Sequence, residues 1–165
     1  MNSISGEIDC HVEEAGETDL PWVQEIMVQC ISDTVSPGDI VRIGRERIRD
    51  IALSEFQRFS NPLAGPNVVL VAKSSTNDRL GMVSIVTSYD ANSGEFIGWI
   101  PCLFVDPQHR GKGLGRRLMD EAERWAKSKS FRKIALTVNP ANEKAMSLYE
   151  RSGFNVANVE MTKPI

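Results

Sequence analysis

Residues 103–126 read LFVDPQHRGKGLGRRLMDEAERWA and join three local patterns in one stretch. An apolar run ends at Val105, glycines recur at 111, 113 and 115, and apolar residues then recur at helical spacing up to Ala126. Glycines let consecutive backbone N–H groups turn toward one point, and the start of a helix favours negative charge. The stretch therefore predicts either an anion cradle or a simple glycine-rich turn with solvated basic residues.

Two common phosphate-binding loops are excluded by spacing. A P-loop carries Ser or Thr directly after its Gly-Lys pair, whereas Gly113 follows Lys112 here. A dinucleotide-binding fingerprint that started at Gly111 would need its third glycine where Arg116 stands. Any anion held by this loop would therefore be held in another way.

The rest of the chain supplies strands and helices on both sides of this stretch. We expect an edge strand over 7–14, a helix over 17–32 and a second helix from about Ile40 to Phe59. A hairpin of strands over 68–73 and 80–89, a strand from Glu95 to Val105 and a helix from Leu114 follow. A strand over 133–138, a short helix that ends at Gly153 and final strand material over 154–165 complete the order. This order predicts one α/β or α+β domain over 1–165, with a mixed sheet and helices on both faces.

Composition excludes several classes of function. The net charge of −3 and the pI of about 5.5 argue against nucleic acid and anionic membrane partners. The first residues lack the features of a secretory signal, and no apolar run is long enough to span a bilayer. Cys10, Cys30 and Cys102 are odd in number and widely spaced, which favours reduced thiols and a cytoplasmic protein. No Cys/His cluster has metal-ligand spacing, so no metal is expected.

Two motifs in order carry a resemblance to a known family. Arg110, Gly113 and Gly115 fit a loop pattern of Gln or Arg, two residues, Gly, one residue, and Gly or Ala. An Asn followed seven residues later by Tyr, and then by a Gly-Phe pair, is present at Asn142 and Tyr149. With the strand between them, these motifs make residues 95–155 similar to the GNAT family of acyl-CoA-dependent N-acyltransferases.

The resemblance implies a fold, a cosubstrate and a set of site residues. It implies a mostly antiparallel sheet that splays after the strand preceding the glycine loop, and acetyl-CoA as cosubstrate with no metal. The pyrophosphate would be held at the loop, the pantetheine arm along the preceding strand and at Asn142, and Tyr149 would protonate the leaving thiolate. The implied cofactor-binding set is Leu103, Phe104, Val105, Arg110, Gly111, Lys112, Gly113, Leu114, Gly115, Arg116, Asn142 and Tyr149.

Each of the two helix residues also has a structural interpretation. Asn142 could cap the helix locally, and Tyr149 could be a core aromatic residue whose hydroxyl reaches water. Pro101 lies inside the strand that precedes the loop and predicts an irregular sheet there, because proline is mostly confined to edges and bulges.

The general base is not assigned from the sequence. Family members frequently carry an acidic residue just before the apolar triplet on this strand, but Ile100, Pro101 and Cys102 stand there. Glu95 and Asp90 are the nearest acidic candidates, and solvated charges at strand ends are the alternative interpretation of both. Water alone as the proton acceptor, or a substrate amine of low pKa, is the other alternative.

The resemblance implies an N-acetyltransferase in which a primary amine attacks acetyl-CoA directly. The missing strand carboxylate keeps open a second function, an acyl-CoA-binding or sensing domain with little activity. Substrate choice would lie in the helices over about 18–60, where Glu25, Asp33 and Asp39 could attract a cationic amine. A small molecule and a peptide or protein amine both remain open as acceptor, and a homodimer is allowed.

Overall fold

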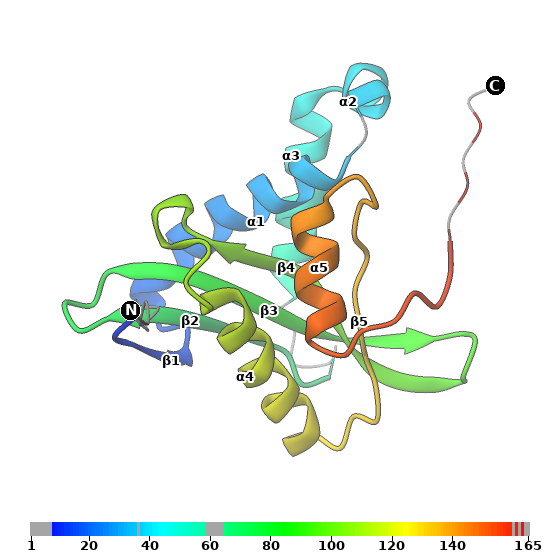
Figure 1. The fold of residues 1–165 in the computed structure, drawn as a ribbon. Coiled ribbons are helices and arrows are strands. Elements are labelled where there is room, and N and C mark those ends of the chain that lie inside the picture. Colours follow the sequence, from blue (N-terminus) through cyan, green and yellow to red (C-terminus); the bar gives the residue numbers. More distant parts are fainter. Residues whose placement is uncertain (1–7, 36, 59–64, 160, 162, 164–165) are drawn as a thin grey trace, which may run out of the picture.

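Five strands form one open sheet whose spatial order follows the chain, β1-β2-β3-β4-β5 (Figure 1). The computed structural model describes residues 8–35, 37–58, 65–159, 161 and 163. The strands are β1 (Cys10–Glu14), β2 (Val68–Ser74), β3 (Arg79–Asp90), β4 (Glu95–Val105) and β5 (Ile134–Ala135). Neighbouring strands are antiparallel except β4 and β5, which are parallel. The predicted mixed, mostly antiparallel sheet is confirmed.

Helices cover both faces of this sheet. They are η1 (Glu17–Asp19), α1 (Leu20–Thr34), α2 (Pro37–Ile43), α3 (Arg45–Arg58), η3 (Pro107–His109), α4 (Leu114–Ser128) and α5 (Glu143–Arg151). Because side chains alternate along a strand, β2 turns Leu70 toward α4 on one face and Val71 toward α1 on the other. The alternation explains why β2 is apolar almost throughout, as a strand buried on both faces must be.

The α4 side of the core contains Leu118 and Ala122, which are completely buried against the sheet. The α1 side contains Val23 and Met27, also completely buried, together with Cys102 of β4. The apolar residues at helical spacing in these segments include Leu20 of α1 and Ile51 of α3, yet Leu20 is 43% exposed and Ile51 is 40% exposed. The helical spacing therefore identified the buried faces but made them too wide.

The single helix expected from Ile40 to Phe59 is wrong. Two helices, α2 and α3, occupy this region and are separated at Gly44, whose φ of 81° is left-handed. Glycine adopts that conformation at little cost, so the break is local to this residue. Phe59 lies outside the described residues, as does Glu7 at the start of the expected edge strand.

The C-terminal strands are shorter than expected. The strand predicted over 133–138 is reduced to the two residues of β5. Residues 154–159, expected as final strand material, contain no strand, and Figure 1 shows this part of the chain running away from the sheet. The sheet therefore ends at β5 among the described residues.

A buried ion-pair cluster joins η1 to the edge of the sheet. The carboxylate of Asp19, only 1% exposed, accepts hydrogen bonds from Lys73 Nζ at 2.9 Å and from Arg79 Nε at 2.7 Å. Lys73 Nζ also donates to Glu13 at 2.7 Å. Burial by itself disfavours the ionised carboxylate, but the bonds from Lys73, Arg79 and the Gly16 amide outweigh it and lower the pKa of Asp19 to about 2.

Candidate functional site

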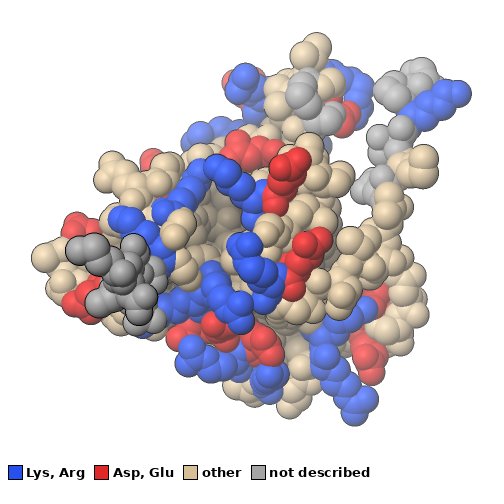
Figure 2. Space-filling model, in the orientation of Figure 1, with Lys and Arg blue, Asp and Glu red and all other residues tan. Residues whose placement is uncertain are grey.

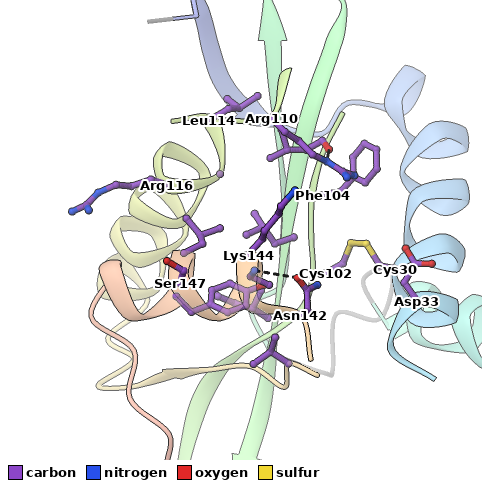
Figure 3. Close-up of a pocket in the computed structure, with 18 of the residues that line it drawn as sticks. Cys30, Asp33, Cys102, Phe104, Arg110, Leu114, Arg116, Asn142, Lys144 and Ser147 are labelled. Carbon is purple, nitrogen blue, oxygen red and sulfur yellow. Dashed lines mark hydrogen bonds between the residues drawn. A yellow bond between two sulfur atoms is a disulfide. The ribbon is translucent and has the colours of Figure 1, made fainter. Parts of the chain in front are cut away.

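The sheet opens between β4 and β5. These strands pair only at Gly98 with Ile134 and at Trp99 with Ala135. Beyond Trp99, the rest of β4 borders a cavity of about 1020 Å³, whose other walls are the glycine loop, α5 and the end of α1 (Figure 3). The predicted splay is therefore present after Trp99.

A β-bulge lies where β4 enters this cavity. Ser84 of β3 pairs with Cys102, and Val86 pairs with Trp99. The one residue between this pair on β3 therefore lies opposite two residues on β4. The extra residue falls at Ile100–Pro101, and proline fits there because it has no N–H to give to the ladder. The irregularity predicted from Pro101 is confirmed.

Hydrogen-bond alternation decides which backbone groups of β4 face the cavity. The N–H of Asp106 donates to the carbonyl of Leu80 on β3 at 2.9 Å, and the register continues without a shift through Leu103. Because pairs in an antiparallel ladder alternate, the N–H and C=O of Phe104 point to β3, whereas those of Leu103 and Val105 point to the open edge. Two of the three residues expected to pair with a pantetheine arm therefore turn backbone groups toward the cavity.

The glycine loop has the backbone conformation of an anion cradle. Gly111 has a φ of 75° and Gly113 a φ of 82°, both left-handed, and Gly113 is the N-cap of α4. A Cβ at either position would meet no atom within 4 Å, so the glycines are required by backbone conformation and not by crowding. Left-handed residues next to a helix start direct N–H groups outward, where the helix dipole also favours an anion.

Gly115 has a different role, which is close packing. A Cβ there would lie 3.1 Å from Cδ2 of Leu148, so α5 approaches α4 at this residue. Leu114 is buried beside it and lines the cavity. The loop sequence therefore sets both the backbone of the cradle and the distance to the helix that carries Asn142 and Tyr149.

The basic residues in and beside the loop differ in whether they line the cavity. Arg110 lines the cavity, and its Nε donates to the carbonyl of Val105 at 2.8 Å. Arg116 also lines the cavity, and its Nη1 donates to the carbonyl of Arg151 at 3.1 Å. Lys112 does not line the cavity, because its Nζ bends back to the carbonyl of Gln108 at 3.2 Å.

Positive charge predominates around the cavity. Figure 2 shows a hollow with lysine and arginine side chains around its rim. The cationic residues of the described lining are Arg110, Arg116, Lys144 and Arg151, and the acidic ones are Asp33 and Glu143. The loop and α5 side is therefore suited to an anionic ligand, while Asp33 lies on the opposite wall formed by α1.

Asn142 and Tyr149 both line the cavity from α5. Asn142 is the N-cap, and its Oδ1 accepts the N–H of Ala145 at 3.1 Å, so the capping role is real and occupies only the side-chain oxygen. Tyr149 packs on Phe154 with ring centroids 5.9 Å apart, and burial raises the pKa of its hydroxyl. The phenol therefore stays protonated at neutral pH and can donate a hydrogen bond.

The structure does not bring the acidic candidates of the hairpin to the cavity. Glu95 lies at the start of β4, at the end away from Leu103, and its nearest cation is Arg132 at 3.8 Å. Asp90 pairs with Lys133, and the bond from that ammonium lowers the pKa of the carboxyl to about 2. Since neither lines the cavity, the geometry gives no support to Glu95 as a base.

Sequence comparison decides the family. A family model described as the acetyltransferase (GNAT) family matches residues 43–154, more than half of the chain. The chain belongs to the GNAT family. A mycothiol acetyltransferase of Propionibacterium freudenreichii is 32% identical over 104 residues, which are 63% of this chain and 33% of that protein. An N-acetyltransferase of Methanocaldococcus jannaschii is 39% identical over 57 residues, which are 34% of this chain and 25% of that one. This GNAT chain therefore matches a third or less of these two relatives.

Solved structures agree with this GNAT assignment. An acetyl transferase from Pyrococcus furiosus superposes with a TM-score of 0.77 at 26% identity, covering 95% of this chain and all of that one. The aminoglycoside N-acetyltransferase AAC(6')-Iy, in complex with a bisubstrate analogue, superposes with a TM-score of 0.70 at 16% identity over 94% of this chain and 97% of its own. The second similarity is one of fold alone.

One feature of this GNAT chain contradicts the sequence interpretation. Cys30 of α1 and Cys102 of β4 form a disulfide, and only Cys10 is a free thiol, so the expectation of three reduced cysteines is wrong. Sequence spacing could not reveal the pair, because the two cysteines are 72 residues apart and meet only when α1 packs on β4. Gln29 and Asp33, also unassigned from motifs, line the cavity beside it.

The described residues contain neither a cluster of metal ligands nor a membrane-spanning helix. No group of three or more His, Cys, Asp or Glu side chains in this part of the chain could hold a metal ion. Within the same residues, no helix is both long and apolar enough to span a bilayer.

Proposed function

We propose that this GNAT protein is an N-acetyltransferase that moves the acetyl group of acetyl-CoA to a primary amine by direct attack. The observation that carries the proposal is a single cavity bordered by the open edge of β4, the glycine loop and the hydroxyl-bearing face of α5. The thioester of acetyl-CoA supplies the activated acetyl group. The residues of the protein would bind acetyl-CoA, orient it for attack and stabilise the leaving sulfur.

The described residues fit acetyl-CoA along the length of the cavity. Backbone N–H groups from Gly111 to Arg116 would hold the pyrophosphate, because the left-handed glycines and the start of α4 favour an anion there. Backbone groups of Leu103 and Val105 would pair with the pantetheine amides as an added strand. The side-chain N–H₂ of Asn142 would donate to the same arm, since the cap uses only its oxygen.

Tyr149 would act on the leaving sulfur. A phenol of pKa ~10 that gives its proton to a thiolate of pKa ~8.5 is about 2 kcal/mol uphill in water. Burial raises the pKa of Tyr149 further, so complete transfer is less favourable still. Tyr149 would therefore stabilise the sulfur by hydrogen bonding as negative charge develops on it.

The attacking amine must be neutral. An amine of pKa ~10.4 is neutral about once in 2,500 molecules at pH 7, a cost of about 4.6 kcal/mol. The carboxylates of the described cavity lining are Asp33 and Glu143, both exposed to solvent. The proton would therefore leave to water in the open cavity rather than to a buried base.

One observation favours a second candidate function, an acyl-CoA-binding or sensing domain with little activity. Ile100, Pro101 and Cys102 provide no carboxylate at the bulge where the acetyl group would lie. Such a domain would bind acetyl-CoA equally well and would differ only in turnover.

The acceptor that we propose is a small-molecule amine. The relatives and structural neighbours include an aminoalkylphosphonate N-acetyltransferase of Salmonella typhimurium and the aminoglycoside enzyme described above. A cytoplasmic location and a homodimer stay predictions. Free thiols no longer support the cytoplasmic location, because two of the three cysteines are bonded to each other.

The test is a coupled binding and turnover assay. Binding of acetyl-CoA is measured on the protein alone. Protein and acetyl-CoA are then mixed, in separate reactions, with neamine, an aminoalkylphosphonate or a peptide with a free N-terminus, and release of the CoA thiol is followed. Turnover with at least one of the small amines supports the proposed enzyme. Binding of acetyl-CoA without turnover over the panel favours the sensing domain, and absence of binding contradicts both functions.

A further inference from the structure

The last turn of α1 forms the wall of the cavity that faces the glycine loop and α5. Gln29, Cys30, Asp33 and Thr34 line the cavity from this turn (Figure 3). Arg116 of α4 and Lys144 and Arg151 of α5 line the cavity from the other elements, together with the acidic Glu143 of α5. If acetyl-CoA lies along the loop, β4 and α5, the wall left for the acceptor amine is this turn.

The turn is held to the sheet in an unusual way. Val23 and Met27, earlier in α1, are completely buried, and Ile26 is 8% exposed. From Val28 to Thr34, by contrast, no residue is buried. The direct covalent link from this part of α1 to the sheet is the disulfide between Cys30 and Cys102, whose Cα atoms are 5.9 Å apart.

The other end of that link lies next to the point of reaction. Cys102 is 3% exposed, follows the bulge at Ile100–Pro101 and directly precedes Leu103, whose backbone faces the cavity. A movement of Cys30 relative to Cys102 therefore changes the distance between the wall of α1 and the position proposed for the acetyl group.

We infer that the Cys30–Cys102 disulfide is a positioning element that fixes the last turn of α1 as the acceptor wall, an inference that rests on the proposed acetyltransferase function. With the link closed, Asp33 is held at the cavity. Its carboxylate and the carbonyl end of the α1 dipole both favour a positive charge, which selects a cationic amine as acceptor. The pyrophosphate side of the cavity is not tied to the link, because neither the glycine loop nor α5 carries Cys30 or Cys102.

Opening the link is ordinary thiol chemistry. A dithiol reagent attacks one sulfur, the S–S bond breaks, and two electrons and two protons convert the bridge to the thiols of Cys30 and Cys102 while the reagent becomes a cyclic disulfide. A low-molecular-weight disulfide such as oxidised glutathione reverses the change by two exchange steps that release two reduced glutathione molecules. The same protein can therefore be measured with the link closed and open.

The first experiment requires no acceptor. Protein purified without reductant is unfolded and alkylated, and we expect one modified cysteine, Cys10. Amide hydrogen exchange is then measured before and after reduction, with faster exchange expected in residues 30–35 and no change in residues 111–117. Three alkylated cysteines, or unchanged exchange in residues 30–35 after reduction, would overturn the inference.

The second experiment uses kinetics with neamine as the cationic acceptor. Reduction should raise the KM for neamine several-fold and leave the Kd for acetyl-CoA unchanged. Cys30→Ser and Cys102→Ser should both have the raised KM and no response to reductant, and Cys10→Ser, the matched control, should respond as the wild type does. An equal loss of acetyl-CoA affinity on reduction would contradict a role confined to the acceptor wall.

The two experiments separate this inference from the proposed function. If acetyl-CoA does not bind, the proposed function fails, while alkylation and hydrogen exchange still show whether the link orders the end of α1. If neamine is acetylated with the same KM in both redox states, the enzyme stands and the positioning role of the disulfide is rejected.

Discussion

Tyr149 combines a hydroxyl group at the cavity with a ring packed in the core. Its ring lies against Phe154, which fixes its direction, and burial raises the pKa of the hydroxyl. A partly buried phenol of raised pKa is a hydrogen-bond donor over the whole physiological pH range. This single side chain therefore carries the only acid role that we assign.

Tyr149→Phe tests that role while keeping the ring. Loss of a positioned proton donor should lower kcat by roughly 10²-fold, with a much smaller change in the KM for acetyl-CoA. Tyr89→Phe is the matched control, since Tyr89 is 60% exposed and makes an edge-to-face contact with Phe96 on the hairpin of β3 and β4. Steady-state kinetics on both variants provide the measurement, and an unchanged kcat in Tyr149→Phe would remove the residue from the mechanism.

Asp19 gives a prediction about stability and pH. Its pKa is about 2 in the folded protein against 3.8 for the free side chain, so folding favours the ionised form. The resulting stabilisation of about 2 kcal/mol is complete above about pH 4 and is lost as the pH falls toward 2. Urea denaturation between pH 2 and 5 should follow this slope.

Asp19→Asn should abolish that part of the pH dependence and destabilise the protein at neutral pH. The variant leaves the buried ammonium of Lys73 with one carboxylate partner, and breaking a buried ion pair costs about 3–5 kcal/mol. Asp120→Asn, on the exposed side of α4, serves as control. An Asp19→Asn variant as stable as the wild type at pH 7 would show that the cluster does not hold η1 to the sheet.

At the scale of elements, the distance between α4 and α5 controls the site. Gly115 lies where a Cβ would come within 3.1 Å of Leu148, and α5 carries both Asn142 and Tyr149. A larger residue on α4 would push the whole helix α5, and with it both side chains.

Gly115→Val should therefore weaken acetyl-CoA binding and stability together. Overpacking typically costs about 1–3 kcal/mol, measurable by denaturation and by calorimetric titration of acetyl-CoA. The double variant Gly115→Val with Leu148→Ala should recover part of both losses, because it makes room for the added methyl groups. Additive effects of the two substitutions would contradict direct crowding between the helices.

Elements with strong local signals were predicted well from the sequence. The strand from Glu95 to Val105 has the bounds of β4, because its apolar run and flanking turn are local features. The helix over 40–59 was wrong because one left-handed residue, Gly44, interrupts an otherwise continuous pattern. The strand over 133–138 was too long, since its apolar sequence lies beside the splay, where no neighbouring strand pairs with it beyond Ala135.

For the molecule as a whole, the motifs gave one half of the cavity and missed the other. Two short motifs, a helix start and a seven-residue spacing, make four of the lining residues recognisable in the sequence: Arg110, Gly113, Asn142 and Tyr149. The α1 wall, with Asp33 and the disulfide, depends on contacts between residues far apart in the chain. Such contacts have no local sequence signal, so spacing could reveal neither the bonded cysteines nor which acidic residue of the helices over 18–60 faces the cavity.

The disulfide also predicts a change in overall stability. It closes a loop between residues 72 apart, and a link of that span typically contributes about 2–4 kcal/mol by restricting the unfolded chain. Urea denaturation of the wild type with a dithiol reagent should show this loss, and Cys30→Ser should be insensitive to the reagent. Equal midpoints with and without reductant would show that the link contributes nothing to folding.

The most direct test of the central claim is a thermal-shift titration with acetyl-CoA on the wild type, Gly113→Asp and Gly153→Asp. Both glycines have left-handed φ angles with no atom within 4 Å of an added Cβ, so the variants carry equal backbone strain, and only Gly113 lines the cavity. Acetyl-CoA at 100 times its Kd stabilises by about 2.7 kcal/mol, a shift of a few degrees. We predict that the wild type and Gly153→Asp shift and that Gly113→Asp does not. A wild type that does not shift at millimolar acetyl-CoA, or a Gly113→Asp variant that shifts equally, would contradict the assignment of the loop as the cradle for coenzyme A.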